Sequence, residues 1–179
     1  MISMSKKAWV WITAISLLAV AGVFFTTGCG PYKFADVSLP DSIKTVKVNY
    51  IENRASYVNP QLSPTLTDKL RQKIVSQTKL TQVNADIADY NISGAITNYS
   101  VSTAGISQQQ AATNRLTVTV SISITDKNNL PVKDKENISI SRTFDFSATL
   151  TLQQAEAAIN DEMIRNLTDE IFNRIFSDW

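Results

Sequence analysis

Residues 116–125 read Leu-Thr-Val-Thr-Val-Ser-Ile-Ser-Ile-Thr, and this stretch decides the fold. Aliphatic side chains occupy every second position, and hydroxyl side chains fill the positions between them. Successive residues of a strand point to opposite faces of the sheet, so this alternation predicts a half-buried strand. Its aliphatic face is expected against the core, and its Ser/Thr face is expected to point outward.

A second strand follows a turn at residues 126–131. Its apolar side chains share one face, which Arg142 interrupts; they are Ile138, Ile140, Phe144 and Phe146. Upstream, Tyr90, Ile92 and Ile96 share a face with Gly94 between them, and the parity then changes to Tyr99 and Val101. A shift of one residue in the alternation predicts a β-bulge after this point.

The remaining elements are one short strand and two helices. Residues 45–50 alternate and predict a strand. Asn59-Pro60 and Ser63-Pro64 are typical helix starts, and an apolar stripe follows at Leu62, Leu66, Leu70 and Ile74. Thr151 and Gln154 form a capping-box pattern before a long amphipathic helix. The end of this helix, at Phe172, Phe176 and Trp179, is expected to overhang the sheet.

The element order is therefore strand-helix-strand-strand-strand-helix. This order predicts an α+β domain in which two helices pack on one face of a four-stranded, mostly antiparallel sheet. Residues 102–114 are polar and are interpreted as an exposed loop or hairpin tip between two of the strands.

The N-terminal residues have the pattern of an export signal. Two lysines precede an apolar run from Ala8 to Phe25, and small residues then lead to Cys29, the only cysteine. This resembles a bacterial lipoprotein signal, so we expect residues 1–28 to be removed and Cys29 to carry a lipid. Residues 29–41 are then a lead from the anchor, and residues 42–179 form one domain. An uncleaved anchor remains open, because the apolar run is marginally long enough to span a bilayer. A chance buried cysteine after an ordinary signal also remains open.

Composition excludes several classes of function. The chain has 17 Lys and Arg against 16 Asp and Glu, so it lacks the basic excess typical of nucleic-acid binding. Without histidine and with one cysteine, it cannot form the usual zinc sites, a Ser-His-Asp triad or a disulfide. No glycine-rich phosphate loop occurs. We therefore predict no enzyme, no catalytic or metal-binding residue, and no cofactor besides the lipid on Cys29.

The outward face of the two central predicted strands is unusual. It carries only hydroxyl side chains, without Lys or Glu, at Thr117, Thr119, Ser121, Ser139, Ser141 and Thr143. Exposed strands often carry Lys, which opposes edge-to-edge pairing. Ordinary solvent exposure is one interpretation of these six positions, and contact with another protein is the other.

Several segments together resemble the LptE family, the lipopolysaccharide-assembly lipoproteins of Gram-negative outer membranes. They are residues 28–34 (Gly-Cys-Gly-Pro-Tyr-Lys-Phe), residues 85–99, residues 141–144 (Ser-Arg-Thr-Phe) and the final helix. The resemblance implies two helices against a four-stranded sheet. It also implies a lipid-anchored protein on the periplasmic side of the outer membrane that plugs the LptD β-barrel.

The resemblance further implies contact with lipopolysaccharide through basic residues. In the family these lie near the loop after the second strand and at the junction into the last helix. Here residues 102–114 and 147–154 contain no Lys or Arg, and the nearest candidate is Arg115. Two other functions remain open: an auxiliary lipoprotein of a lipid-transport ABC system, and a binding protein for a small amphiphile.

Overall fold

The computed structural model describes residues 42–176, except residues 86, 108–109, 129 and 134. The predicted signal, the lead with Cys29, and Trp179 lie outside the described residues. The elements in chain order are β1 (Thr45–Val48), β2 (Glu52–Asn53), α2 (Leu62–Gln77), β3 (Thr81–Gln82), β4 (Tyr90–Ser107), β5 (Gln110–Asp126), β6 (Ile138–Ser147) and α3 (Leu152–Phe176).

These strands form one mixed sheet in the order β3-β1-β4-β5-β6, with β2 also beside β4. The long pairs β4–β5 and β5–β6 are antiparallel, whereas β1 runs parallel to β3 and β4. The predicted α+β class is confirmed, and the four predicted strands are β1, β4, β5 and β6. The sheet has two more strands than predicted, because β2 and β3 are each two residues long and show no periodicity.

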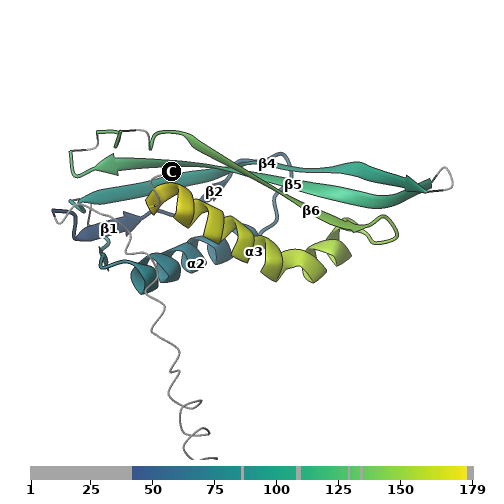
Figure 1. Cartoon of the computed structure of the whole chain (residues 1–179), viewed down its shortest axis with the longest axis horizontal. Helices are drawn as coiled ribbons and strands as arrows, with labels where there is room; N and C mark the ends of the chain where they lie inside the picture. The colour runs from purple at the N-terminus through teal and green to yellow at the C-terminus, as the bar shows by residue number, and fades with distance from the viewer. Residues whose placement is uncertain (1–41, 86, 108–109, 129, 134, 177–179) are drawn as a thin grey trace, which may run out of the picture. The chain divides into compact units, whose positions relative to one another are not determined.

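Both helices cover the same face of the sheet (Figure 1). The aliphatic residues of β5 lie beneath them, and Leu116, Val118, Val120 and Ile122 are 0% exposed. The predicted stripe of α2 is also fully buried, from Leu62 to Ile74. Burying these side chains from both layers is the main stabilising contribution, since each one contributes about 1.5–3 kcal/mol.

A bulge in β4 lies where the sequence predicted it. Ile96 pairs with Val120, and Asn98 pairs with the adjacent Thr119, so Thr97 is the extra residue. The bulge shifts the alternation by one position, which places Tyr99 in the core at 5% exposure. Without this shift the ring of Tyr99 would point to the outer face.

Residues 102–114, for which an exposed loop or a hairpin tip was expected, form the far part of a hairpin and are largely paired β-structure. Strand β4 continues to Ser107 and β5 begins at Gln110, and Ser102 pairs with Arg115 inside the stretch. Polar Ser and Thr residues are compatible with strands, so their polarity did not indicate a loop. The result is a long hairpin whose far end extends beyond the helices (Figure 1).

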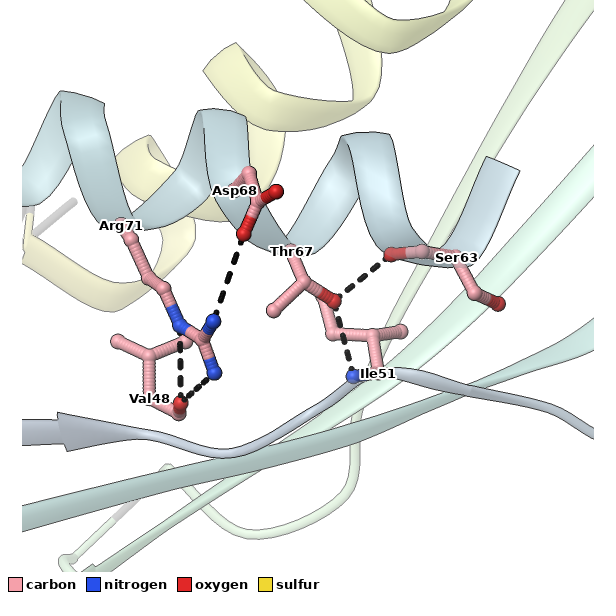
Figure 2. A network of polar contacts seen from close by, with 6 residues as sticks. All are labelled: Val48, Ile51, Ser63, Thr67, Asp68 and Arg71. Carbon is pink, nitrogen blue, oxygen red and sulfur yellow. Dashed lines mark hydrogen bonds and ion pairs between the residues drawn. The ribbon is translucent and has the colours of Figure 1, made fainter. Parts of the chain in front are cut away.

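The connection between β1 and β2 depends on α2. The pairing offset to β4 changes by one residue there, from Val48↔Ile92 to Glu52↔Ala95. Figure 2 shows how side chains of α2 contact the connection between β1 and β2. Arg71 donates to the Val48 carbonyl from Nη2 at 2.8 Å, and the Ile51 N–H donates to Thr67 Oγ1 at 3.1 Å. These side chains satisfy backbone groups that would otherwise be buried without partners.

The N-terminus of α3 is fixed by side chains that the sequence indicated, whereas its C-terminal end differs from the expectation. The backbone N–H of Gln154 donates to Thr151 Oγ1, and the backbone N–H of Thr151 donates to Gln154 Oε1. The predicted capping box is therefore confirmed. At the other end, Phe172 and Phe176 are buried, with 4% and 7% exposure. The expected overhang is therefore wrong for these two rings, which pack into the core.

Arg142 explains the interruption of the inner face of β6. Its guanidinium forms an ion pair with Glu170 of α3, and Arg174 pairs with the same carboxylate at 3.2 Å. An inward-pointing charge on an edge strand also disfavours pairing with another chain. Of the helices in the described part of the chain, none is both long and apolar enough to cross a membrane.

Candidate partner-binding face

The six hydroxyl residues singled out in the sequence lie together on the sheet face opposite the helices. Register brings them into three cross-strand pairs: Thr117 with Thr143, Thr119 with Ser141, and Ser121 with Ser139. Thr119 Oγ1 and Ser141 Oγ are 3.2 Å apart and share a hydrogen bond. We call these six residues the hydroxyl face.

The neighbouring strand β4 extends this surface, which sequence reasoning did not anticipate. Ala95 lies opposite Ser121, Asn98 opposite Thr119, and Ser100 opposite Thr117. Their side chains are also small and uncharged. The predicted bulge was the available signal, because counting the alternation again after Thr97 places Asn98 and Ser100 on the outer face.

A shallow hollow of about 240 Å³ lies beside the hydroxyl face. It is lined by Arg54, Ser93, Gly94, Ala95, Thr97, Ser121, Ser123 and Asn137. At its rim, Asn137 has a positive φ of 53°, a conformation that asparagine tolerates better than most residues. The Asn137 N–H donates to Ser123 Oγ at 3.1 Å, which fixes this corner against β5.

The other end of the hydroxyl face is bounded by one ion pair. Arg115 and Asp145 face each other across β5 and β6, and the guanidinium donates to both carboxylate oxygens at 2.6 and 2.8 Å. These hydrogen bonds lower the pKa of Asp145 and raise the pKa of Arg115. Arg115, the residue nominated for lipopolysaccharide, is thus already engaged with a carboxylate.

The side chains of this face are able to hydrogen-bond to another molecule. A hydroxyl group can both donate and accept a hydrogen bond, and small side chains let another backbone approach closely. The described residues hold no group of three Cys, Asp or Glu side chains arranged to bind a metal ion. Cys29, the predicted lipid attachment site, lies outside the described residues.

The sequence match covers the domain just described. Residues 43–175 match the family described as LptE, lipopolysaccharide-assembly. The chain belongs to the LptE family. The match includes every strand of the sheet, the whole of α2, and α3 as far as Ile175, one residue before its end. A search of curated proteins finds no match to this LptE-family sequence.

Solved structures of other lipoproteins share the fold of this LptE-family protein. A minor lipoprotein from Acinetobacter baumannii superposes with a TM-score of 0.52 at 15% identity, covering 76% of this chain and 94% of that one. An uncharacterized lipoprotein B from Nitrosomonas europaea gives a TM-score of 0.51 at 18% identity, covering 80% and 88%. At such identities the likeness concerns the fold alone.

Proposed function

We propose that this LptE-family protein is a non-enzymatic lipoprotein of the outer membrane that plugs an LptD-type β-barrel during lipopolysaccharide assembly. Its hydroxyl face and the adjoining part of β4 are the proposed contact surface. Family membership supports the role in lipopolysaccharide assembly. Family membership alone does not identify the barrel as the partner or the hydroxyl face as the contact surface, so both are parts of the proposal.

The observation that carries the proposed contact is the pairing of the hydroxyl residues. All six lie in three consecutive cross-strand pairs on the face that α2 and α3 leave uncovered. The Arg115–Asp145 ion pair flanks this surface at one end. No charged side chain interrupts the six hydroxyl positions on this face of β5 and β6. A smooth, uncharged sheet can lie against the polar wall of a barrel without burying an unpaired charge, which would be costly.

We further propose that Cys29 carries the lipid and holds the domain on the periplasmic side of the outer membrane. Replacing Cys29 with Ser should abolish fatty-acid labelling. Continued labelling of this variant would disprove the proposed anchor and leave the fold of residues 42–176 unaffected.

A direct role of Arg115 in binding lipopolysaccharide is a weaker part of the proposal. A phosphate group would have to compete with Asp145 for the guanidinium, because two hydrogen bonds already orient it. Residues 102–114 contain no Lys or Arg that could bind the phosphate in place of Arg115. Plugging the barrel does not depend on this contact.

The proposed contact is tested by placing a bulky charge in its centre. Thr119→Arg should prevent recovery of the barrel in a pull-down from detergent extracts, because a guanidinium would be buried against the partner without a counter-charge. The variant should still fold, as judged by circular dichroism and thermal melting, since Thr119 lies outside the core.

The matched control is Gln77→Arg, which adds the same charge at the exposed last residue of α2. It should retain the barrel. Barrel recovery with Thr119→Arg at the level of this control would disprove the hydroxyl face as the contact. Recovery of inner-membrane transporter subunits in place of a barrel would instead indicate an auxiliary role in an ABC system.

A further inference from the structure

A groove of about 650 Å³ runs along the surface between α2 and α3, on the side of the helix layer away from the hydroxyl face. The α2 side contributes Thr65, Lys69, Gln72, Lys73 and Ser76, and the α3 side contributes Asp161, Ile164, Arg165, Thr168 and Asp169. From Thr65 to Ser76 the groove follows α2 for about 16 Å, at 1.5 Å per residue. That length matches about five residues of an extended chain.

The register of the two helices places two cations, Lys69 and Arg165, on opposite sides of the groove. The helices run parallel, because Tyr57 before α2 contacts Glu156 and Lys73 further along contacts Asp169. Lys73 and Asp169 form an ion pair at 2.8 Å. One turn earlier on both helices, the residues are Lys69 and Arg165.

Within the described part of the chain, neither Lys69 nor Arg165 forms an ion pair or a side-chain hydrogen bond. Both side chains are exposed at the groove. Two cations on opposite sides of one groove repel, and an anion placed between them would relieve this repulsion.

An unpaired hydroxyl in the groove wall points to the same kind of ligand. Thr168 is only 4% exposed, and its Oγ1 has no hydrogen-bond partner among the described residues. A buried hydroxyl without a partner costs about 1–3 kcal/mol, so such groups are normally satisfied. Thr168 and, one turn before it, Ile164 both line the groove on its α3 side.

We propose that this groove binds an extended acidic segment of a partner protein. A carboxylate of the segment lies between Lys69 and Arg165, and the segment also supplies an acceptor for the Thr168 hydroxyl. A phosphate-bearing headgroup fits less well, because Asp161 lines the groove one turn before Arg165. Alternating charges along the groove suit a polypeptide, whose carboxylate can lie near the cations while its N–H groups lie near Asp161.

The test uses full-length protein in a non-ionic detergent and a fluorescein-labelled six-residue oligoglutamate peptide. Fluorescence anisotropy at low ionic strength should show binding that weakens as salt is added. Lys69→Glu places a carboxylate opposite Arg165 and so forms the ion pair within the groove. Binding of the peptide should fall by about tenfold or more, because an attractive contact becomes a repulsive one.

Lys79→Glu is the matched control, since it makes the same charge change at an exposed lysine beyond the groove. It should bind the peptide like the unmodified protein. Thr168→Val should also weaken binding while the circular dichroism spectrum is unchanged. Thr119→Arg on the opposite layer should leave peptide binding intact, which separates this site from the proposed barrel contact.

Four results would overturn the proposal. Absence of peptide binding at low salt, or equal affinity in Lys69→Glu, would exclude the groove as the site. Equal weakening in Lys79→Glu would show a general charge effect. Binding of phosphatidylglycerol vesicles, lost in Lys69→Glu, without binding of the peptide would assign the groove to a phosphate headgroup.

Discussion

The two faces of β5 share one backbone and differ in what their side chains do. On the inner face, Leu116, Val118, Val120 and Ile122 are fully buried beneath the helices. On the outer face, Thr117, Thr119 and Ser121 are only partly buried and face small residues of β4 and β6. The comparison separates residues that hold the fold together from residues that are available for another purpose.

The difference is energetic as well as spatial. Each inner side chain removes apolar surface from water, whereas an exposed hydroxyl pair exchanges hydrogen bonds with water at little net gain. The composition of the outer face is therefore weakly constrained by stability. That freedom makes the absence of Lys and Glu from the hydroxyl face informative about function.

The largest expected effect comes from the inner face. Ile122→Ala should lower the free energy of unfolding by about 2–5 kcal/mol, because it leaves a cavity in a tightly packed core. Ile122 is 0% exposed and pairs with Gly94 on one side and Ile138 on the other. A urea titration followed by circular dichroism measures this loss. A loss no larger than that of an outer-face variant would show that the two faces are assigned wrongly.

Gly94 sharpens the comparison because it makes room for Ile122. A Cβ atom at Gly94 would lie 2.5 Å from Ile122 Cδ1 and 2.9 Å from the Ser121 carbonyl oxygen. The backbone oxygen cannot move without disturbing the pairing of β4 with β5. Gly94→Ala should therefore cost about 1–3 kcal/mol, the usual range for overpacking.

A double variant separates the two clashes at Gly94. Ile122→Val removes Cδ1, so Gly94→Ala should cost less in that background than in the unmodified protein. The same urea titration measures the coupling. Equal costs in both backgrounds would mean that the contact with Ser121 alone makes glycine necessary.

The periodic spacing of apolar residues predicted most of the fold. The alternation at residues 116–125 predicted the buried face of β5, and the change of parity after Asn98 predicted the bulge that turns Tyr99 inward. For residues 102–114 the sequence left a loop and a hairpin tip open, because Ser, Thr and Gln are common in both loops and strands. Their pairing in the hairpin depends on the partner strand, which no local pattern reveals.

Sites that depend on register were less accessible from the sequence. The six hydroxyl residues were found from alternation, but their pairing required the offset between β5 and β6. The groove between the helices was not anticipated. Lys69 and Arg165 lie far apart in sequence, and only the packing of α2 against α3 brings them to opposite sides of one groove.

The smallest expected effect concerns the centre of the hydroxyl face. Thr119→Ala removes the hydrogen bond to Ser141 Oγ and the Thr methyl group, and nothing in the core. Water replaces the lost hydrogen bond at an exposed position, so the free energy of unfolding should change by no more than about 0.5 kcal/mol.

This small effect is useful because it is matched to Ile122→Ala on the same strand. If the hydroxyl face serves binding, Thr119→Ala should leave both stability and barrel recovery nearly unchanged, since alanine is also small and uncharged. Thr119→Arg should differ from it only in the pull-down. A urea titration measures the stability of Thr119→Ala. A loss of about 2 kcal/mol or more, the lower end of the range for core changes, would show that the hydroxyl face contributes to folding. The absence of charge there would then have a structural cause.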